Sequence, residues 1–296
     1  MNTDTLVDRL VGHLREGYIF PDRAARASEL LDARRDAYAG ADGPELCERI
    51  SADLLEACDD KHLRLIWHET PTEAVDEAEL HAALRERIRR ENHGVRRVEL
   101  RPDNIGLIEL TIVPEPATGG PNLAAAMQLM ENTEALVLDL RPTLGGSPDG
   151  VVFLASFLFP DGEVHLSDFV EGANGPTRQY WTSAFVPGPR YLDRPVYVLT
   201  SASTFSGGEA LAYDLQALGR VVVVGETTRG GAHPSIMVPL TEQIELRLPV
   251  ARPINAATGG NWEGVGVQPD IAVPAADALD EACRAALAAR VDSAET

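Results

Sequence analysis

Apolar positions recur at helical spacing through the first part of the chain. Leucines one turn apart predict an amphipathic helix over residues 3–17. Two further helices are expected at about 22–38 and 44–58, the last opened by a proline. Because short connections between helices favour antiparallel packing, we expect residues 1–60 to form a small three-helix bundle.

The pattern changes to strands after this bundle. Residues 62–68 alternate in polarity and predict a strand that carries His62 and Arg64 on the same face. A charged helix and then a two-stranded hairpin are expected next, at about 74–92, 95–100 and 105–113.

From residue 121 onward, apolar strands alternate with helical segments. The expected strands are 135–140, 196–200 and 221–224, and the expected helices are about 122–130, 149–158 and 207–218. The remainder is expected as an irregular excursion over 160–194, two strands near 235–240 and 243–250, and a last helix at about 275–290. This succession predicts an α/β (α+β) fold of parallel βαβ units with mixed strands added, in one core over residues 61–296.

Composition and charge exclude several classes of protein. Apolar residues make up 44% and charged residues 24% of the chain, which is typical of a globular protein. The net charge of −20 argues against nucleic acids and anionic membranes as partners, because both require a basic face. We expect no signal peptide, no membrane-spanning segment, and three buried thiols, hence a cytoplasmic protein. The sequence leaves the oligomeric state open.

The stretch 196–215 carries the first candidate chemistry. A buried strand leads through a tight turn to Ser206, two glycines and a helix. A serine hydroxyl there lies beside unpaired backbone N–H groups, as a nucleophile next to an oxyanion site would. The alternative is a capping box, in which Ser206 and Glu209 only satisfy the first helical turn.

A nucleophile also needs a base and supporting groups. Two histidines are candidates, His62 at the start of a strand and His233 in a glycine-rich loop. Glu263, between Trp262 and a glycine, could orient a histidine or could simply be an exposed turn acid. No spacing of His, Cys or acidic residues indicates a metal site, and no glycine-rich stretch fits a nucleotide-binding motif, so no cofactor is expected.

Several segments, taken in order, resemble one family closely. They are 60–64 (DKHLR), 138–141 (LDLR) with Gly145 and Gly146, 200–209, 224–234, and 261–270 (NWEGVGVQPD). The chain resembles the C-terminal-processing, or tail-specific, serine peptidases, in the branch of the tricorn core protease and the interphotoreceptor retinoid-binding protein.

The resemblance implies a helical N-terminal domain packed on a crotonase/Clp-protease-like core, and it implies roles for individual residues. Ser206 matches the nucleophile, His62 the base and Glu263 the late supporting glutamate. The N–H groups of Gly207 and of the loop at Gly145 and Gly146 match the oxyanion donors. Arg64, Arg229, His233 and Trp262 are expected to line the substrate site.

The chain also departs from the family pattern. The lysine of the classical members is replaced by Gly231, and no PDZ-like insertion is evident. In the oxyanion loop, Thr143 replaces an asparagine and Leu144 a glycine, and a leucine adopts positive φ only at a cost. Arg229 replaces a glycine and adds a cation that could bind a carboxylate or block a cleft.

Three functions remain open on these grounds. The first is a serine peptidase that acts on a peptide or an unfolded protein. The second is a non-proteolytic member of the family that binds a small apolar ligand, and the third is a repurposed small-molecule enzyme such as a cyclase or an esterase. The matches at Ser206, His62 and Glu263 favour the peptidase, although a fold by itself does not fix a function.

Overall fold

The computed structural model describes residues 3–71, 77–160, 162–172 and 175–294. The chain divides into two compact units, and each is composed of several segments. The first unit comprises residues 1–84, 169–178 and 233–253, and the second comprises residues 85–168, 179–232 and 254–296. Within the described residues, no helix combines the length and the apolar character needed to cross a bilayer.

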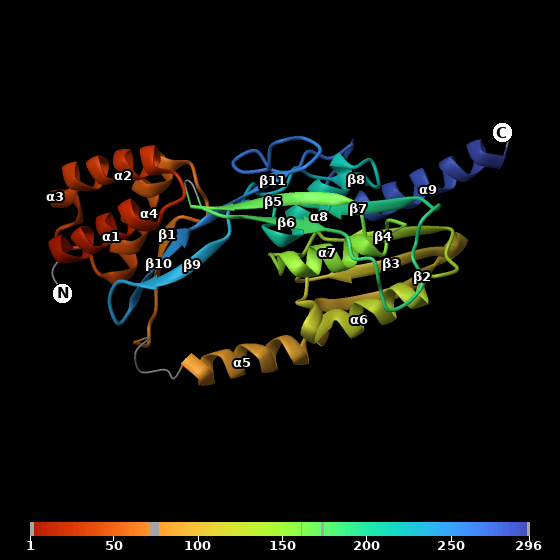
Figure 1. Ribbon diagram of the computed structural model, residues 1–296, viewed down its shortest axis with the longest axis horizontal. Helices are drawn as coiled ribbons and strands as arrows, with labels where there is room; N and C mark the ends of the chain where they lie inside the picture. Colours follow the sequence, from red (N-terminus) through yellow and green to blue (C-terminus); the bar gives the residue numbers. More distant parts are fainter. Residues whose placement is uncertain (1–2, 72–76, 161, 173–174, 295–296) are drawn as a thin grey trace. The chain divides into compact units, whose positions relative to one another are not determined.

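The helices of the first unit form the expected N-terminal bundle (Figure 1). They are α1 (Thr3–Gly17), α2 (Pro21–Ala33), α3 (Arg35–Tyr38) and α4 (Gly43–Cys58). The Asp42 side chain caps α4 by accepting the Glu45 N–H at 3.0 Å. The helix expected over 22–38 is divided because Arg34, with φ −103° and ψ 10°, leaves the helical conformation between α2 and α3.

The same unit contains an antiparallel sheet in the order β1-β10-β9. Its strands are β1 (Arg64–Trp67), β9 (Ser235–Pro239) and β10 (Ile244–Pro249). Leu65, Leu246 and Leu248 are buried in one apolar core with the leucines of α1 and α4. The compact unit therefore does not end at the expected boundary after residue 60, because these strands share the core of the helices.

The second unit is built on a six-stranded sheet in the order β12-β8-β7-β4-β3-β2. The strands are β2 (Val95–Arg101), β3 (Ile105–Leu110), β4 (Ala135–Asp139), β7 (Val196–Thr200), β8 (Val222–Gly225) and β12 (Ile271–Ala272). Neighbouring strands from β3 to β12 are parallel, and β2 is antiparallel to β3 as the hairpin pattern predicted. The mixed α/β class expected from the sequence is confirmed.

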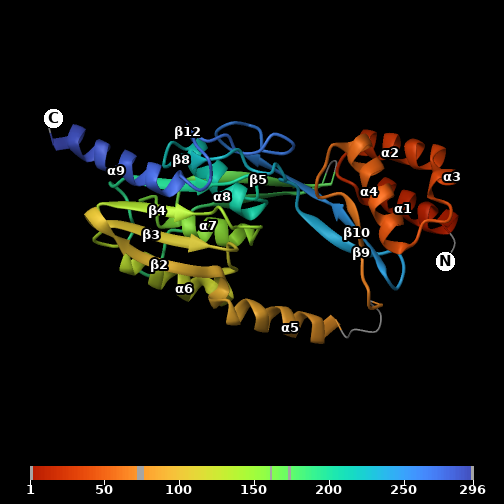
Figure 2. The same ribbon diagram turned by 180° about the vertical axis from the view of Figure 1, so that it is seen from behind.

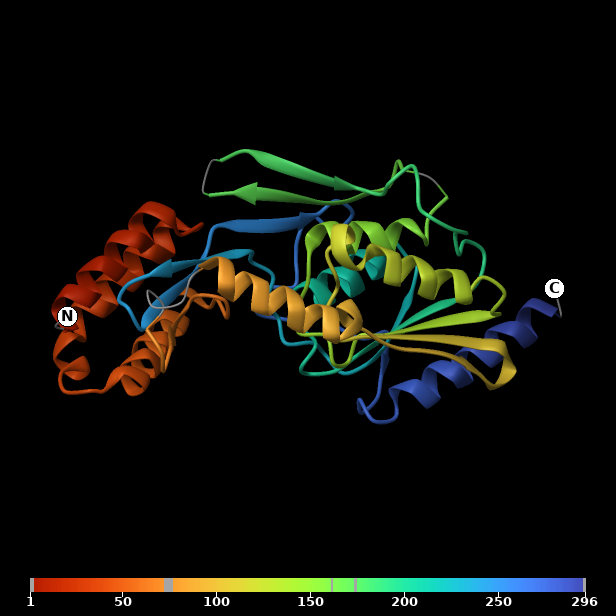
Figure 3. The same ribbon diagram turned by 90° about the horizontal axis from the view of Figure 1, so that it is seen from below.

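Helices cover both faces of this sheet (Figure 3). One face packs against α6 (Pro116–Leu129), α7 (Pro148–Ser156) and α8 (Gly207–Ala217), and the other against α9 (Ala278–Ala294). Figure 2 shows α9 from behind, next to β8 and β12. Both faces of β4 and β7 are buried, which explains their continuous apolar sequences.

One expectation outside these layers needs revision. The stretch 160–194 contains the strands β5 (His165–Glu171) and β6 (Thr177–Trp181), which form a sheet in the order β11-β5-β6 with β11 (Ala251–Asn255). Their burial does not alternate strictly, so the period-two signal of a strand is weak.

The charged helix α5 spans Glu77–Arg90, and residues 74–76 of its predicted range lie outside the described residues.

Candidate active site

Ser206 lies at a strained turn between β7 and α8. Its backbone has φ 53° and ψ −116°, a conformation that costs a residue with a side chain about 1–3 kcal/mol. Thr204 holds this turn in place, because its hydroxyl donates a hydrogen bond to the Leu140 carbonyl oxygen at 2.9 Å. Phe205 donates its N–H to the Thr143 carbonyl at 3.0 Å. A strained strand–turn–helix serine is the geometry of a nucleophile elbow, which a simple helix cap does not require.

The loop at Gly145 and Gly146 lies directly against this turn. A Cβ atom placed on Gly145 would lie 3.7 Å from the Cβ of Ser206, and one placed on Gly207 would lie 2.7 Å from the Gly146 nitrogen. Among the hydrogen bonds of the described residues, none uses the N–H of Gly146 or Gly207. Two backbone donors therefore lie side by side next to the serine hydroxyl, as an oxyanion site requires.

The two substitutions in this loop do not distort it. Positive φ angles occur at Gly145 (152°) and Gly146 (149°), whereas Leu144 is not among the residues with positive φ. The buried hydroxyl of Thr143 donates to the Leu110 carbonyl at 2.6 Å and so ties the loop to β3. The expected cost of a leucine at positive φ therefore does not arise, and glycine stands where the backbone needs it.

Glu209, three residues after Ser206, is fully buried and accepts four hydrogen bonds. One oxygen accepts from the Thr228 hydroxyl at 2.5 Å and the Gly230 N–H at 2.6 Å. The other accepts from the Ser206 N–H at 2.8 Å and the Gly231 N–H at 3.0 Å. Burial raises the pKa of Glu209, and these hydrogen bonds counteract part of that rise.

The loop that follows β8 lies beside the segment that contains Glu263. The Trp262 indole N–H donates to the Gly231 carbonyl at 3.0 Å, and the Glu263 carboxylate accepts the Ala232 N–H. Trp262 is only 2% exposed and belongs to the core of the second unit. Its position gives it a packing role, which differs from the substrate contact expected from the sequence.

Arg229 is exposed at the tip of the same loop. Its N–H donates to the Thr204 carbonyl at 3.1 Å, and its guanidinium lies 4.7 Å from the centroid of the Phe205 ring. Phe205 directly precedes Ser206 in the chain. The second unit thus brings the candidate nucleophile, both candidate oxyanion donors and an exposed cation together.

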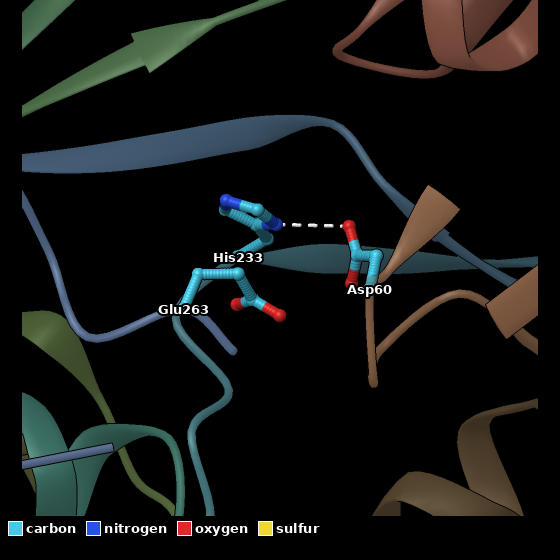
Figure 4. Close-up of side chains that lie close together, drawn as sticks. All are labelled: Asp60, His233 and Glu263. Carbon is cyan, nitrogen blue, oxygen red and sulfur yellow. Dashed lines mark hydrogen bonds and ion pairs between the residues drawn. The ribbon is translucent and has the colours of Figure 1, made fainter. Parts of the chain in front are cut away.

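In the first unit, the two candidate histidines, His62 and His233, each form a hydrogen bond with one buried carboxylate, that of Asp60. Asp60 accepts the His62 backbone N–H at 3.0 Å through one oxygen. Its other oxygen accepts from the Tyr18 hydroxyl at 3.0 Å and lies 2.8 Å from Nδ1 of His233 (Figure 4). Burial by itself raises the pKa of Asp60, but the hydrogen bond and charge of His233, together with the hydrogen bonds from His62 and Tyr18, lower the net pKa.

His62 is held neutral by its surroundings. Burial, followed by the charge of Arg247, lowers the pKa of His62 to about 3. Arg64 contributes in the same direction, and it pairs with Arg247 across β1 and β10. The imidazole is therefore uncharged at neutral pH, which is the protonation state of a general base before it accepts a proton.

Sequence reasoning did not assign two of these groups. The pattern around Glu209 predicts only a helix cap, and Asp60 stands only within a matching motif. Three of the donors to Glu209 are 19 to 22 positions away, and the ring of His233 is 173 positions from Asp60. Local patterning therefore gave no signal for either set of contacts, although the capping-box spacing did select Glu209.

Comparisons with known proteins agree with this architecture. Residues 104–273, more than half of the chain, match Peptidase family S41. The chain is 30% identical over 178 residues, 60% of its length, to the carboxyl-terminal-processing peptidase 2, chloroplastic, of Arabidopsis thaliana. That match spans 33% of the length of the relative.

Solved structures of peptidases share the fold. A putative peptidase from Parabacteroides merdae has a TM-score of 0.64 and 19% identity, with 93% of this chain and 90% of the other covered. The tricorn protease has a TM-score of 0.58 and 13% identity, with 94% of this chain and 35% of the other covered. The chain belongs to peptidase family S41.

Proposed function

We propose that the protein is a serine peptidase-like hydrolase that cleaves peptides or unfolded proteins by acyl transfer. Ser206 is the nucleophile, His62 is the general base, and Glu263 supports the polar network. Ser206 and His62 belong to different units, so their pairing is part of the proposal. Membership of a peptidase family supports it at the level of reaction type.

The observation that carries the proposal is the strained backbone of Ser206 beside two unused backbone donors. Ser206 and Glu209 do form a capping box, but an N-cap residue typically has β-region φ and ψ, whereas a nucleophile gains exposure of its hydroxyl from a turn with φ 53°. The close packing of Gly207 on Gly146 fixes the two N–H groups relative to the hydroxyl before substrate binds. Preorganised donors of this kind are among the largest contributions to catalysis of acyl transfer.

The reaction follows from these positions. The His62 imidazole takes the hydroxyl proton as Ser206 Oγ forms a bond to the substrate carbonyl carbon. The carbonyl oxygen becomes an oxyanion that accepts hydrogen bonds from the backbone N–H groups of Gly207 and Gly146. His62 then gives the proton to the leaving amine, and water hydrolyses the acyl-enzyme by the same steps.

The other two functions have weaker support. The altered oxyanion loop was the main ground for the ligand-binding alternative, and neither Thr143 nor Leu144 has a positive φ. Proteolysis is therefore the function that the geometry supports best, with Arg229 and Arg64 as candidate substrate-binding cations.

Casein, an unstructured protein, provides the test. Wild type should release peptides detectable by mass spectrometry, and Ser206→Ala and His62→Gln should release none above background while retaining the wild-type melting temperature. Full activity in Ser206→Ala would refute the nucleophile, and full activity in His62→Gln would refute the base. Absence of cleavage by all three proteins would contradict the peptidase assignment.

A further inference from the structure

We propose that Glu209 is a positioning residue that fixes Ser206 and the Thr228–Gly231 loop as one hydrogen-bonded assembly. The inference rests on the proposed function of Ser206 and goes beyond it. It assigns the buried carboxylate a role in the rate of acylation that helix capping alone would not give.

The first argument is the burial of Glu209. Its exposed fraction is 0%, and a carboxylate without partners at such a position would be strongly destabilising. An ionised carboxyl group has about four lone-pair sites, and Glu209 uses all four. The group is therefore an organised acceptor whose donors are fixed in number and direction.

The second argument is the identity of the donors. Of the four hydrogen bonds to the Glu209 carboxylate, a capping box requires only the one from the Ser206 N–H. The other three donors come from the loop after β8, which has no part in capping α8. One carboxylate oxygen of Glu209 accepts hydrogen bonds from both the Ser206 N–H and the Gly231 N–H. The strained backbone of the nucleophile is therefore connected to that loop through a single atom.

The third argument is what the loop carries. Thr228 accepts the Val267 N–H at 2.7 Å, and Gly230 accepts the Gly264 N–H at 3.2 Å. Ala232 donates its N–H to the Glu263 carboxylate. Glu209 therefore positions the nucleophile, the exposed Arg229 and the segment of Glu263 relative to one another.

Glu209→Gln is the sharpest perturbation. In either orientation of the amide, its NH₂ group replaces one accepting oxygen and faces two donors that need an acceptor. Glu226→Gln is a matched control, because Glu226 also joins two segments by accepting the N–H groups of Ala202 and Ala275, each at 3.0 Å. Both changes remove acceptors, but only one acts on Ser206.

The readouts are the rate at which a serine-reactive fluorophosphonate labels Ser206 and the separate kcat and KM for a casein-derived peptide. We expect Glu209→Gln to lower the labelling rate and kcat at least tenfold with little change in KM. Glu226→Gln should alter the melting temperature only. Wild-type labelling and kcat in folded Glu209→Gln would overturn the inference.

A second pair of variants covers the case in which Glu209→Gln does not fold. Thr228→Val removes one of the four donors, and Thr228→Ser retains the hydroxyl. We expect slower labelling in the valine variant and recovery in the serine variant, and equal rates in all three proteins would overturn the inference. Wild type that leaves Ser206 unlabelled would instead contradict the proposed function, and this inference with it.

Discussion

Substitution of Gly207 by alanine probes the candidate oxyanion site without removing a functional group. The backbone N–H of residue 207 is retained, and Gly207 is not among the residues with positive φ, so alanine is compatible with the local backbone. The added Cβ, however, would lie 2.7 Å from the Gly146 nitrogen and 3.0 Å from the Gly145 carbonyl carbon. Both neighbours are backbone atoms, so the methyl group must displace the loop.

The size of the effect follows from that distance. Ordinary van der Waals contact of a Cβ begins at 3.4 Å, so the Gly146 nitrogen must move by about 0.7 Å. A displacement of this order separates the two donors from the position of the oxyanion. Loss of one oxyanion donor lowers kcat by about 10²–10³-fold, or about 3–4 kcal/mol, and we expect Gly207→Ala to fall in that range.

The assay is kcat and KM for peptide hydrolysis, with the free energy of unfolding measured in urea. Gly12→Ala is the matched control, since a Cβ on Gly12 in α1 meets nothing within 4 Å. It should stabilise the helix by about 0.8–1 kcal/mol and leave kcat unchanged. A kcat for Gly207→Ala within twofold of wild type would refute the assignment of these N–H groups.

Three further predictions concern separate parts of the molecule. Burial lowers the pKa of His62 from 6.5 to about 3 in the folded protein. Between these two pH values the imidazole is protonated in the unfolded state but not in the folded state, so the free energy of unfolding rises with pH. His62→Gln should flatten that slope in urea unfolding between about pH 4 and about pH 7, and an unchanged slope would contradict the buried neutral imidazole. Gly43→Ala places a Cβ 2.1 Å from the Trp67 ring and should destabilise the protein by about 1–3 kcal/mol in thermal unfolding; wild-type stability would show that the ring moves freely. If Arg229 binds a substrate carboxylate, wild type should prefer peptides with a carboxylate near the scissile bond, and Arg229→Glu should lower kcat/KM for these peptides about tenfold relative to neutral ones, or by about 1.4 kcal/mol. Equal selectivity of wild type and Arg229→Glu would exclude carboxylate binding by Arg229.

Local patterns predicted the elements around Ser206 well. The strand over 196–200 and the helix from residue 207 both carry their signal within one element, because burial on both faces and helical spacing are visible in the sequence. The glycines at 145 and 146 were also selected by the sequence, and each occupies a backbone position that favours glycine.

Contacts between distant segments could not be predicted in the same way. β10 pairs with β1 although their sequences lie far apart, and this pairing draws both strands into the core of the N-terminal helices. The acceptor role of Asp60 toward His233 and that of Glu209 toward the loop after β8 have the same origin. The roles of His62 and Glu263 were suggested by the family resemblance, since spacing alone did not distinguish them from ordinary surface or core residues.

The central claim is that Ser206 forms a covalent acyl-enzyme. Its most direct test is rapid acid quenching of a reaction with an activated ester, followed by intact-mass measurement and peptide mapping. We expect a transient mass increase equal to the acyl group, located on Ser206 and absent from Ser206→Ala. An adduct on another residue, or steady hydrolysis by Ser206→Ala at the wild-type rate, would contradict the mechanism.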